Sequence, residues 1–316
     1  MKIVFLDQST LGEISLEKFD EIGDVTIYDK TAPEQTQERI ERADIIITNK
    51  VVISKAMMQN AKQLKLICVA ATGVNNIDLN AAKEMHITVA NVAGYSTESV
   101  VAQTFALYFA CAHNSKYYDE YAKNSWSKSA IFTHFTPTYS ELFGKKWGII
   151  GLGSIGRRVA TIVEAFGCEV SYYSTSGKNS SKDYTQKSLD ALLSESDIIS
   201  IHAPLNSDTL NLIDAQKLKR MKASGIIINL GRGGIINEQD LADVLDLGLI
   251  QGAGVDVLST EPPTKEQPLL NLNAPERLTL SPHLAWAGVE ARTRLVQEIF
   301  ENIVAFSENR ERNKVN

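Results

Sequence analysis

A glycine-rich loop set between an apolar run and a helical pattern constrains the fold of this chain more than any other feature. The loop, Gly151-Leu152-Gly153-Ser154-Ile155-Gly156, directly follows the strand-like run Trp147 to Ile150 and opens into a helical pattern, Arg157 to Phe166. In such a loop the first glycine makes the tight turn, the second lets backbone amides approach a pyrophosphate, and the third permits close helix-strand packing. The amino end of the helix adds about half a positive charge. The loop therefore predicts dinucleotide binding through Gly151, Gly153, Ser154, Ile155 and Gly156, with a turn that binds no ligand as the alternative.

Short runs rich in Val and Ile alternate with helical patterns on both sides of this loop. The first set of runs is Ile3 to Leu6, Val25 to Tyr28, Ile45 to Thr48, Leu66 to Ala70 and Ile87 to Ala90. The second set is Trp147 to Ile150, Glu169 to Tyr173, Ile198 to His202, Ile226 to Leu230, Gly254 to Val257 and Leu278 to Leu280. A helix is expected over 34–42 after Pro33, and Ser54 and Asp78 are candidate caps of the next two helices. Apolar strands separated by helices predict parallel sheets that are covered on both faces.

A chain of 316 residues is long enough for about two domains. A long helical pattern, Thr97 to Tyr121, links the two sets of runs, and a polar, aromatic stretch without periodicity, Asn124 to Ser140, follows it. The content of 44% hydrophobic and 22% charged residues is typical of a globular protein. The longest nearly apolar run, Val100 to Ala112, is too short to cross a bilayer.

Charge, cysteine usage and the first residues argue against several classes of protein. The formal net charge of -6 lacks the basic footprint of a nucleic-acid binder, so no nucleic-acid or membrane partner is expected. An acid, Asp7, follows only four apolar residues, so the start of the chain lacks the apolar stretch of a secretory signal. This favours a cytoplasmic protein. The widely spaced Cys68, Cys111 and Cys168 are predicted to be reduced core residues. No cysteine-histidine cluster or H-E-x-x-H helix indicates a metal.

The position after the next strand bears on the choice of cofactor. A dinucleotide fold normally carries there an acid that binds the ribose 2′-hydroxyl of NAD. Ser174 occupies the position and begins the run Ser174-Thr175-Ser176-Gly177-Lys178. Hydroxyls and one cation do not repel a 2′-phosphate, so the run slightly favours NADP, or the use of both NAD and NADP. Since the run contains no Arg, ordinary turn residues remain the alternative.

Three charged residues lie just beyond runs of the second set, where open parallel sheets bind their ligands. Arg232 stands among glycines in Asn229-Leu230-Gly231-Arg232-Gly233-Gly234, where a guanidinium can hold a carboxylate bidentately. His283 lies in Ser281-Pro282-His283-Leu284-Ala285-Trp286, and Glu261 lies in Ser259-Thr260-Glu261-Pro262-Pro263. Taken alone, each is more typical of a structural or solvated residue.

Together with the glycine loop, these residues resemble the D-isomer-specific 2-hydroxyacid dehydrogenase family over nearly the whole chain. Further similar segments are Ala71 to Asp78, Glu141 to Lys145, His202 to Leu205 and Gly254 to Leu258. Asn91 to Thr97 and Pro282 to Trp286 look most like the glycerate dehydrogenase or hydroxypyruvate reductase branch. Asn75-Asn76 differs from the Asp-Asn of many relatives, which bears on the substrate side of the site.

The resemblance implies an α/β fold of two doubly wound parallel-sheet domains, in which a Rossmann NAD(P)-binding domain is inserted into a flavodoxin-like substrate domain. Residues 1–98 and 286–316 would form the discontinuous substrate domain. Residues 99–285 would form the dinucleotide-binding domain. The resemblance also suggests a homodimer.

The implied activity is the reversible reduction of a small 2-oxo acid, of the hydroxypyruvate or glyoxylate type, by NAD(P)H. His283 would be the acid and base, Glu261 would orient its ring, and Arg232 with backbone amides of Gly73, Val74 and Asn75 would hold the substrate carboxylate. Asp256 would bond to the nicotinamide carboxamide. The other cofactor contacts expected beside those above are Thr104, His202, Pro204, Leu230, Gly231, Arg232 and His283.

Two further residues are candidates for the substrate side. Lys50 ends a run of the first set and is expected to contact the substrate carboxylate or a distal hydroxyl, with a solvated lysine as the alternative. Trp286 is a candidate wall of the substrate site, and packing at an interface is equally compatible with its position.

Two other functions fit the same resemblance. One is a non-catalytic, NAD(H)-sensing protein like the transcriptional corepressors of this fold, although the long extra tails of those proteins are missing here. The other is a 3-phosphoglycerate dehydrogenase, which is less favoured because no regulatory domain follows Asn316 and no extra basic cluster awaits a phosphate.

Overall fold

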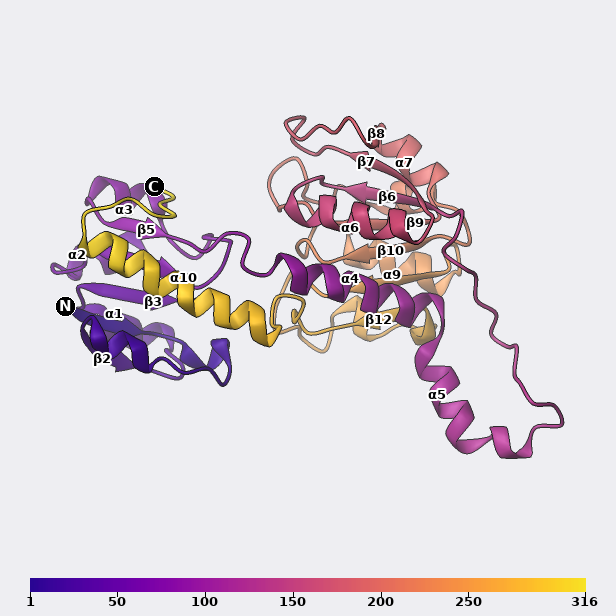
Figure 1. Cartoon of the computed structure of the whole chain (residues 1–316), viewed down its shortest axis with the longest axis horizontal. Coiled ribbons are helices and arrows are strands. Elements are labelled where there is room, and N and C mark those ends of the chain that lie inside the picture. Colours follow the sequence, from indigo (N-terminus) through magenta and orange to yellow (C-terminus); the bar gives the residue numbers. More distant parts are fainter. The chain divides into compact units, whose positions relative to one another are not determined.

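The computed structural model describes all residues from Met1 to Asn316. The chain forms two compact units (Figure 1). The discontinuous unit comprises Met1–Ser96 and Ala287–Asn316, and the inserted unit comprises Thr97–Trp286. None of the helices combines the length and the apolar character needed to cross a membrane.

The discontinuous unit is built on a five-stranded parallel sheet in the order β2-β1-β3-β4-β5. Its strands are β1 (Lys2–Phe5), β2 (Asp24–Ile27), β3 (Ile45–Thr48), β4 (Leu66–Val69) and β5 (Thr88–Ala90). Its helices are α1 (Pro33–Ile40), α2 (Lys55–Asn60), α3 (Leu79–Glu84) and α10 (Val289–Ser307), with 3-10 turns η1 (Gln8–Leu11) and η2 (Glu17–Glu21). The strand order is flavodoxin-like, as predicted.

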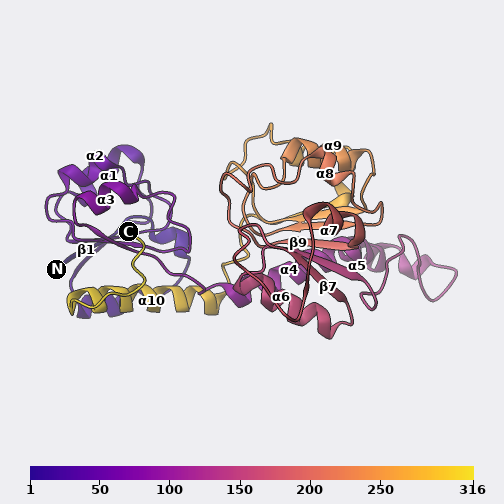
Figure 2. The same ribbon diagram turned by 90° about the horizontal axis from the view of Figure 1, so that it is seen from above.

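Helices cover both faces of this sheet, which explains why its central strands are apolar throughout. Helices α1, α2 and α3 lie on one face and α10 lies on the other (Figure 2). Ile46 and Ile67 pack with Met58 of α2 on the first face. On the other face, the ring of Phe19 contacts both Phe5 and Phe300 edge to face. The predicted caps are confirmed, because the side chains of Ser54 and Asp78 accept bonds from backbone amides in the first turns of α2 and α3.

The inserted unit is built on a seven-stranded sheet in the order β12-β11-β10-β9-β6-β7-β8, and every pair of neighbouring strands is parallel. The strands are β6 (Lys146–Ile150), β7 (Glu169–Tyr173), β8 (Thr185–Gln186), β9 (Ile198–Ile201), β10 (Ile226–Asn229), β11 (Gly252–Val255) and β12 (Leu278–Leu280). The helices are α4 (Thr97–Ala112), α5 (Ser115–Asn124), α6 (Ser154–Ala165), α7 (Leu189–Glu195), α8 (Ala215–Leu218) and α9 (Glu238–Asp246), with 3-10 turns η3 (Trp126–Lys128), η4 (Pro268–Leu270) and η5 (Pro275–Arg277). The order reverses at β6, so the Rossmann prediction is confirmed, with a switch point beside the first strand.

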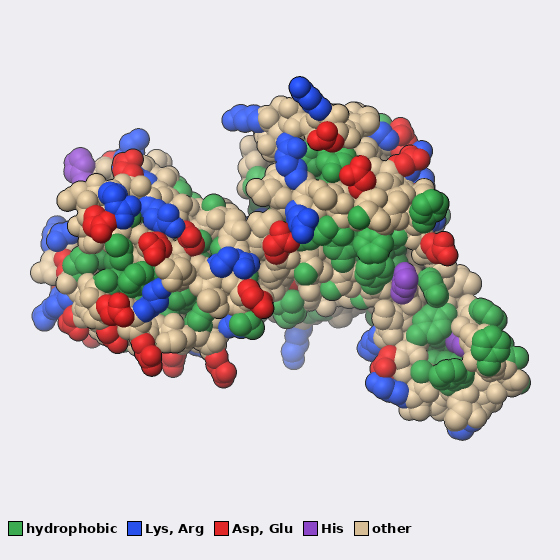
Figure 3. Space-filling model, in the orientation of Figure 1, with side chains coloured by type: hydrophobic (Ala, Val, Ile, Leu, Met, Phe, Trp, Pro, Cys, Tyr) green, Lys and Arg blue, Asp and Glu red, His purple; other side chains and the backbone are tan.

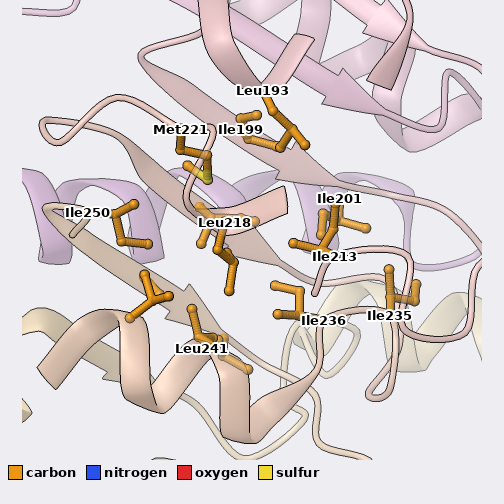
Figure 4. Packing of buried hydrophobic residues seen from close by; sticks show 14 of the residues in the cluster. Leu193, Ile199, Ile201, Ile213, Leu218, Met221, Ile235, Ile236, Leu241 and Ile250 are labelled. Carbon is orange, nitrogen blue, oxygen red and sulfur yellow. The ribbon is translucent and has the colours of Figure 1, made fainter. Parts of the chain in front are cut away.

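Two apolar clusters, one on each face, hold the inserted sheet. One contains Ile150 and Ile201 and side chains of α7, α8 and α9 (Figure 4). The other contains Trp147 and Ile149 with residues of α4 and α6. Alternate residues of β6 thus enter different cores, which keeps the end of this strand, and the glycine loop that follows it, firmly placed.

Two sequence predictions of secondary structure are wrong. The single helix expected over 97–121 ends at Ala112, because Asn114 adopts a left-handed conformation (φ +50°) and α5 starts anew at Ser115. Asn tolerates that conformation better than most residues. The strand expected from Gly254 to Val257 runs instead from Gly252 to Val255. Both Gly252 and Gly254 therefore lie within the strand. Helix α4 packs closely against the strand at this point, since a Cβ atom on Gly254 would lie 3.0 Å from the Cβ atom of Leu107.

Candidate active site

The glycine loop follows β6 at the switch point and leads into α6. Gly151 has a φ of +93°, and a Cβ atom there would lie 2.9 Å from the backbone of His202. A Cβ atom on Gly156 would lie 2.2 Å from the carbonyl oxygen of Gly151, so only glycine lets the helix start this close to the strand. By contrast, a Cβ atom on Gly153 would meet no protein atom within 4 Å. The middle glycine therefore faces open space, as expected of a backbone that a pyrophosphate approaches.

Two polar side chains next to this loop are buried without a protein partner. The hydroxyl of Ser174, after β7, and both ring nitrogens of His202, after β9, make no hydrogen bond. Burial lowers the pKa of His202 to about 3, so its ring is neutral. Buried polar atoms normally have partners, and these two flank the strand that carries the glycine loop. They fit a polar ligand such as the ribose end of a dinucleotide.

The other residues predicted to contact the cofactor have varied surroundings. Thr104 is fully buried in α4, where its hydroxyl donates to the carbonyl oxygen of Val100. Leu230 and Gly231 are buried at the end of β10. The remaining predicted residues are partly or fully exposed: Ser154, Ile155, Thr175, Ser176, Lys178 and Pro204. Their contacts with a cofactor stay predictions.

His283 and Glu261 form a hydrogen-bonded pair. Nδ1 of His283 lies 2.6 Å from Oε2 of Glu261, and the two side chains are 25% and 33% exposed. The other carboxylate oxygen of Glu261 accepts the backbone N–H of Leu258 at 2.9 Å. Because both oxygens are engaged, the carboxylate is held in place, and it fixes the orientation of the imidazole.

Asp256, at the end of β11, shapes the turn that carries His283. Its backbone oxygen accepts the N–H of His283 at 2.8 Å, and its carboxylate accepts the N–H groups of Leu284 and Ala285 at 3.0 Å and the hydroxyl of Ser281. Burial raises the pKa of Asp256, and these hydrogen bonds act in the opposite direction. His283 itself has a φ of +50°, a conformation that a residue other than glycine holds only when its surroundings impose it. Asp256 provides that constraint, in addition to its predicted role at the carboxamide.

Arg232 stands in a turn that packs against the segment carrying Glu261. The side chain of Asn229 closes the turn, accepting from Gly231 N at 3.0 Å and donating to Arg232 O at 2.9 Å. A Cβ atom on Gly233 would lie 1.9 Å from the carbonyl carbon of Leu258. The Arg232 side chain is exposed, and its Nη1 donates to Gly231 O at 2.8 Å. The structure thus brings Arg232, Glu261 and His283 onto adjoining segments of the inserted unit.

The predicted substrate residues of the discontinuous unit lie beyond the carboxyl ends of β3 and β4. Lys50 is exposed, and its backbone N–H donates to the buried carboxylate of Asp7 at 2.6 Å. The side chain of Asn76 donates to Val51 O at 3.0 Å, which ties the loop of Gly73, Val74 and Asn75 to the Lys50 loop. Trp286, the last residue of the inserted unit, is half-buried. No group of three or more His, Cys, Asp or Glu side chains in the structure could hold a metal ion.

Comparison with known proteins places this chain in a family. Residues 105–285 match the model of the D-isomer specific 2-hydroxyacid dehydrogenase, NAD binding domain. The chain is 35% identical to a glycerate dehydrogenase of Methylorubrum extorquens, over 99% of this chain and 98% of the relative. It is 34% identical to a hydroxypyruvate reductase of Blautia hydrogenotrophica, over the full length of both. The chain belongs to the D-isomer-specific 2-hydroxyacid dehydrogenase family.

A solved structure is also similar to this dehydrogenase over its whole length. An acyclic imino acid reductase in complex with NADPH and D-Arg has 32% sequence identity and a TM-score of 0.89, with both chains covered fully. The predicted family and fold are therefore confirmed, and this 2-hydroxyacid dehydrogenase is an oxidoreductase with an NAD(P)-binding Rossmann domain.

Sequence reasoning missed several residues that organise the site of this dehydrogenase. Asn229 closes the Arg232 turn, Asp7 anchors the Lys50 loop, and Glu238 bonds to both Ser259 and Gln267 on either side of Glu261. Asp7 and Asn229 lie at or next to the carboxyl ends of strands, and that position was an available signal. No pattern in the sequence could have pointed to Glu238, because only the tertiary fold brings the first turn of α9 to the Glu261 segment.

Proposed function

We propose that this dehydrogenase reduces a small 2-oxo acid, of the hydroxypyruvate or glyoxylate type, to the D-2-hydroxy acid. The observation that carries the proposal is the 2.6 Å contact between His283 Nδ1 and Glu261 Oε2, on a segment packed against the turn of Arg232. Relatives named glycerate dehydrogenase, hydroxypyruvate reductase and glyoxylate reductase support the same substrate class.

His283 is the proton donor of this reaction. Because Nδ1 is held by Glu261, Nε2 is the ring atom left to exchange a proton with the substrate. When bound, NAD(P)H would supply the hydride that C2 of the 2-oxo acid accepts. The carbonyl π pair goes to the oxygen, which takes the Nε2 proton, and His283 is left neutral, with its remaining proton on Nδ1 and still hydrogen-bonded to Glu261. Oxidation of the hydroxy acid reverses these transfers.

Arg232 holds the substrate carboxylate. Its side chain is exposed at the end of a closed turn, and a guanidinium can donate to both carboxylate oxygens in a planar, charge-assisted pair. That pair orients C2 and leaves the carbonyl oxygen for His283. We assign Lys50, Gly73, Val74, Asn75 and Trp286 to the substrate as further candidates.

The cofactor is NADP, or both NADP and NAD. Ser174 gives the end of β7 a hydroxyl where a carboxylate would repel a 2′-phosphate. Exposed Ser176 and Lys178 follow it and can contribute a hydroxyl and a positive charge. NADPH in the complex of the acyclic imino acid reductase supports this choice.

A turnover assay tests the proposed function. Hydroxypyruvate, glyoxylate, pyruvate and 3-phosphohydroxypyruvate are each supplied with NADH and with NADPH, and the oxidation of the cofactor is followed. We expect the first two acids to be reduced best. Tight cofactor binding without turnover of any acid would favour the corepressor-like alternative. Preference for 3-phosphohydroxypyruvate would favour a 3-phosphoglycerate dehydrogenase.

Three variants separate the proposed roles in the same assay. His283→Ala is expected to lower kcat by about 10²-fold or more with cofactor binding intact. Arg232→Ala is expected to raise the KM of the 2-oxo acid far more than that of the cofactor. Arg220→Ala removes an exposed arginine that pairs with Asp190 at 3.7 Å, and this control is expected to change neither constant. Normal turnover of His283→Ala would remove His283 from the mechanism.

We also propose that the enzyme is a cytoplasmic homodimer. The arm, defined here as 115–141, extends from the inserted unit (Figure 1, Figure 2) and none of its α5 residues is buried. Apolar side chains gather on it (Figure 3), and Phe132, Phe135 and Tyr139 are 88%, 68% and 58% exposed. An exposed apolar patch of this kind is unusual on a monomer and is typical of a protein–protein interface. A second copy of the chain is the proposed partner that covers this patch.

The proposed location in the cytoplasm is supported by the three free cysteines, which are compatible with a reducing compartment.

A further inference from the structure

The segment that carries Glu261 is exposed from one end to the other. All residues from Ser259 to Glu266 are exposed, and Gln267 is the first buried residue after them. A cavity of about 410 Å³ adjoins the segment, and its walls include Ser259, Thr260 and Thr264. Hydrophobic burial therefore contributes little to the position of Glu261, and polar contacts must hold the segment.

Glu238 supplies such contacts on both sides of Glu261. It is the first residue of α9, and its Oε1 accepts the backbone N–H of Ser259 at 2.6 Å. Its Oε2 accepts the hydroxyl of Ser259 at 2.8 Å and the side-chain amide of Gln267 at 2.7 Å. One carboxylate thus ties the first residue of the exposed stretch, Ser259, to the buried residue that follows the stretch, Gln267. Because its acceptors are charged, these hydrogen bonds are stronger than neutral ones.

A short path leads from Glu238 to the imidazole. Ser259, which Glu238 holds, is covalently next to Leu258, whose backbone N–H donates to Glu261 Oε1 at 2.9 Å. The second oxygen of Glu261 lies 2.6 Å from His283 Nδ1. A shift of Ser259 would move the donor that fixes the Glu261 carboxylate, and the orientation of the imidazole would follow.

We infer that Glu238 is a positioning residue for the Glu261–His283 pair. Its hydrogen bonds go to Ser259 and Gln267, and it acts by holding the segment from Ser259 to Gln267 in the position that the Glu261–His283 hydrogen bond requires. The inference rests on the proposed function, in which His283 donates the proton.

The test exchanges the partners of one hydrogen bond. Glu238→Gln keeps one acceptor for Ser259 N–H but sets an amide donor against the amide donor of Gln267. The double variant Glu238→Gln with Gln267→Glu restores a donor and an acceptor at the same place with the direction reversed. Gln239→Ala is the matched control, since this exposed neighbour on α9 bonds to Asp243 and not to the segment.

Steady-state assays and the melting temperature are measured for each variant. Glu238→Gln is expected to lower kcat about 10-fold, because small misplacements of catalytic groups have large effects on rate. The cofactor dissociation constant is expected to stay unchanged, and the double variant to recover most of kcat. Gln239→Ala is expected to match the parent. Where Glu238→Gln does not fold, Ser259→Ala, which removes only the hydroxyl bond, is expected to give a smaller fall in kcat.

A second readout does not depend on turnover. The Nδ1 proton of a histidine bound to a carboxylate gives a downfield proton resonance, which His283→Gln identifies by its loss. We expect this resonance to weaken in Glu238→Gln and to return in the double variant. Parent-like kcat and an unchanged resonance in Glu238→Gln would overturn the inference, as would failure of the double variant to recover either. If the parent reduces no 2-oxo acid, the proposed function fails, and the resonance alone decides the role of Glu238.

Discussion

At the scale of single residues, the protein leaves buried polar atoms unpaired on both sides of the strand that carries the glycine loop. His202 and Ser174 both keep buried atoms without hydrogen bonds, at the ends of strands on either side of β6. An unpartnered buried polar group costs about 1–3 kcal/mol. Such a cost is reasonable at a site where a ligand supplies the missing partner.

His202 makes the stability of the enzyme depend on pH. Its pKa is about 3 in the fold against an ordinary value of 6.5, so the unfolded chain binds the extra proton more readily. The stabilisation is complete above pH 6.5 and is lost as the pH falls from 6.5 towards 3. At pH 5 the loss from this group is about 2 kcal/mol. The free energy of unfolding of the parent and of His202→Gln is measured by urea unfolding at pH 7 and pH 5. Between these two pH values the variant is expected to lose about 2 kcal/mol less stability than the parent. Parallel losses would contradict the prediction.

Ser174 is expected to set the cofactor preference. Ser174→Asp would place a carboxylate where it binds the ribose 2′-hydroxyl of NAD and repels a 2′-phosphate. The ratio of kcat/KM with NADPH to that with NADH is expected to fall about 10-fold or more, which corresponds to about 1.4 kcal/mol. Ser176→Ala, at an exposed position nearby, serves as the comparison and is expected to change the ratio less. A parent with a strong preference for NADH would refute the phosphate pocket.

At the scale of elements, the proposed catalytic groups are held by turns whose backbones touch. The Arg232 turn follows β10 and packs on Leu258, beyond the end of β11, while Asp256 bonds to the turn after β12 that carries His283. Strands β10, β11 and β12 are neighbours in the sheet. Parallel pairing therefore brings three turns, distant in sequence, to one edge.

Two glycine substitutions separate packing from ligand approach. Gly233→Ala would force a Cβ atom to within 1.9 Å of the Leu258 backbone, so the two turns must separate. We expect a loss of about 1–3 kcal/mol of stability, typical of overpacking, together with a fall in kcat. Gly153→Ala has no protein atom within 4 Å of the new Cβ. It is expected to keep its melting temperature while the Kd of the cofactor rises, as measured by thermal unfolding and by fluorescence titration. Equal effects of both variants on stability would contradict this distinction.

At the scale of the whole molecule, the chain crosses twice between two units, and only the inserted unit carries the aromatic arm. The arm is organised by its own contacts, with the His134 ring stacked on Tyr121 at 3.8 Å and bonded to the hydroxyl of Tyr117 at 2.9 Å. An ordered arm with exposed phenylalanines is suited to binding a second copy of the chain.

The oligomeric state tests this arm. Sedimentation velocity of the parent is expected to give a dimer, and Phe132→Ser with Phe135→Ser is expected to give monomers, because these side chains are 88% and 68% exposed without a partner chain. Leu247→Ser, which replaces a 70% exposed leucine outside the arm, is expected to leave the dimer intact. A monomeric parent would end the dimer proposal.

By itself, the sequence determined the class of fold and the identity of the main candidate residues. Local patterns suffice for that purpose, because buried parallel strands are continuously apolar, and a strand-glycine-helix junction has few structural solutions. The resemblance of the segments around Arg232, Glu261 and His283 added the family.

The tertiary structure alone decided how those residues are held. Asp256 and Asn229 have additional roles in the turns that carry His283 and Arg232, and Glu238 contacts Ser259 and Gln267. These contacts join atoms that meet only after the sheet has formed. The break between α4 and α5 at Asn114 also became visible only in the structure. Hydrogen bonds between residues far apart in the chain leave no periodic trace in its sequence. For this reason a sequence can name a candidate catalytic pair such as Glu261 and His283, whereas the groups that hold this pair become visible only in the fold.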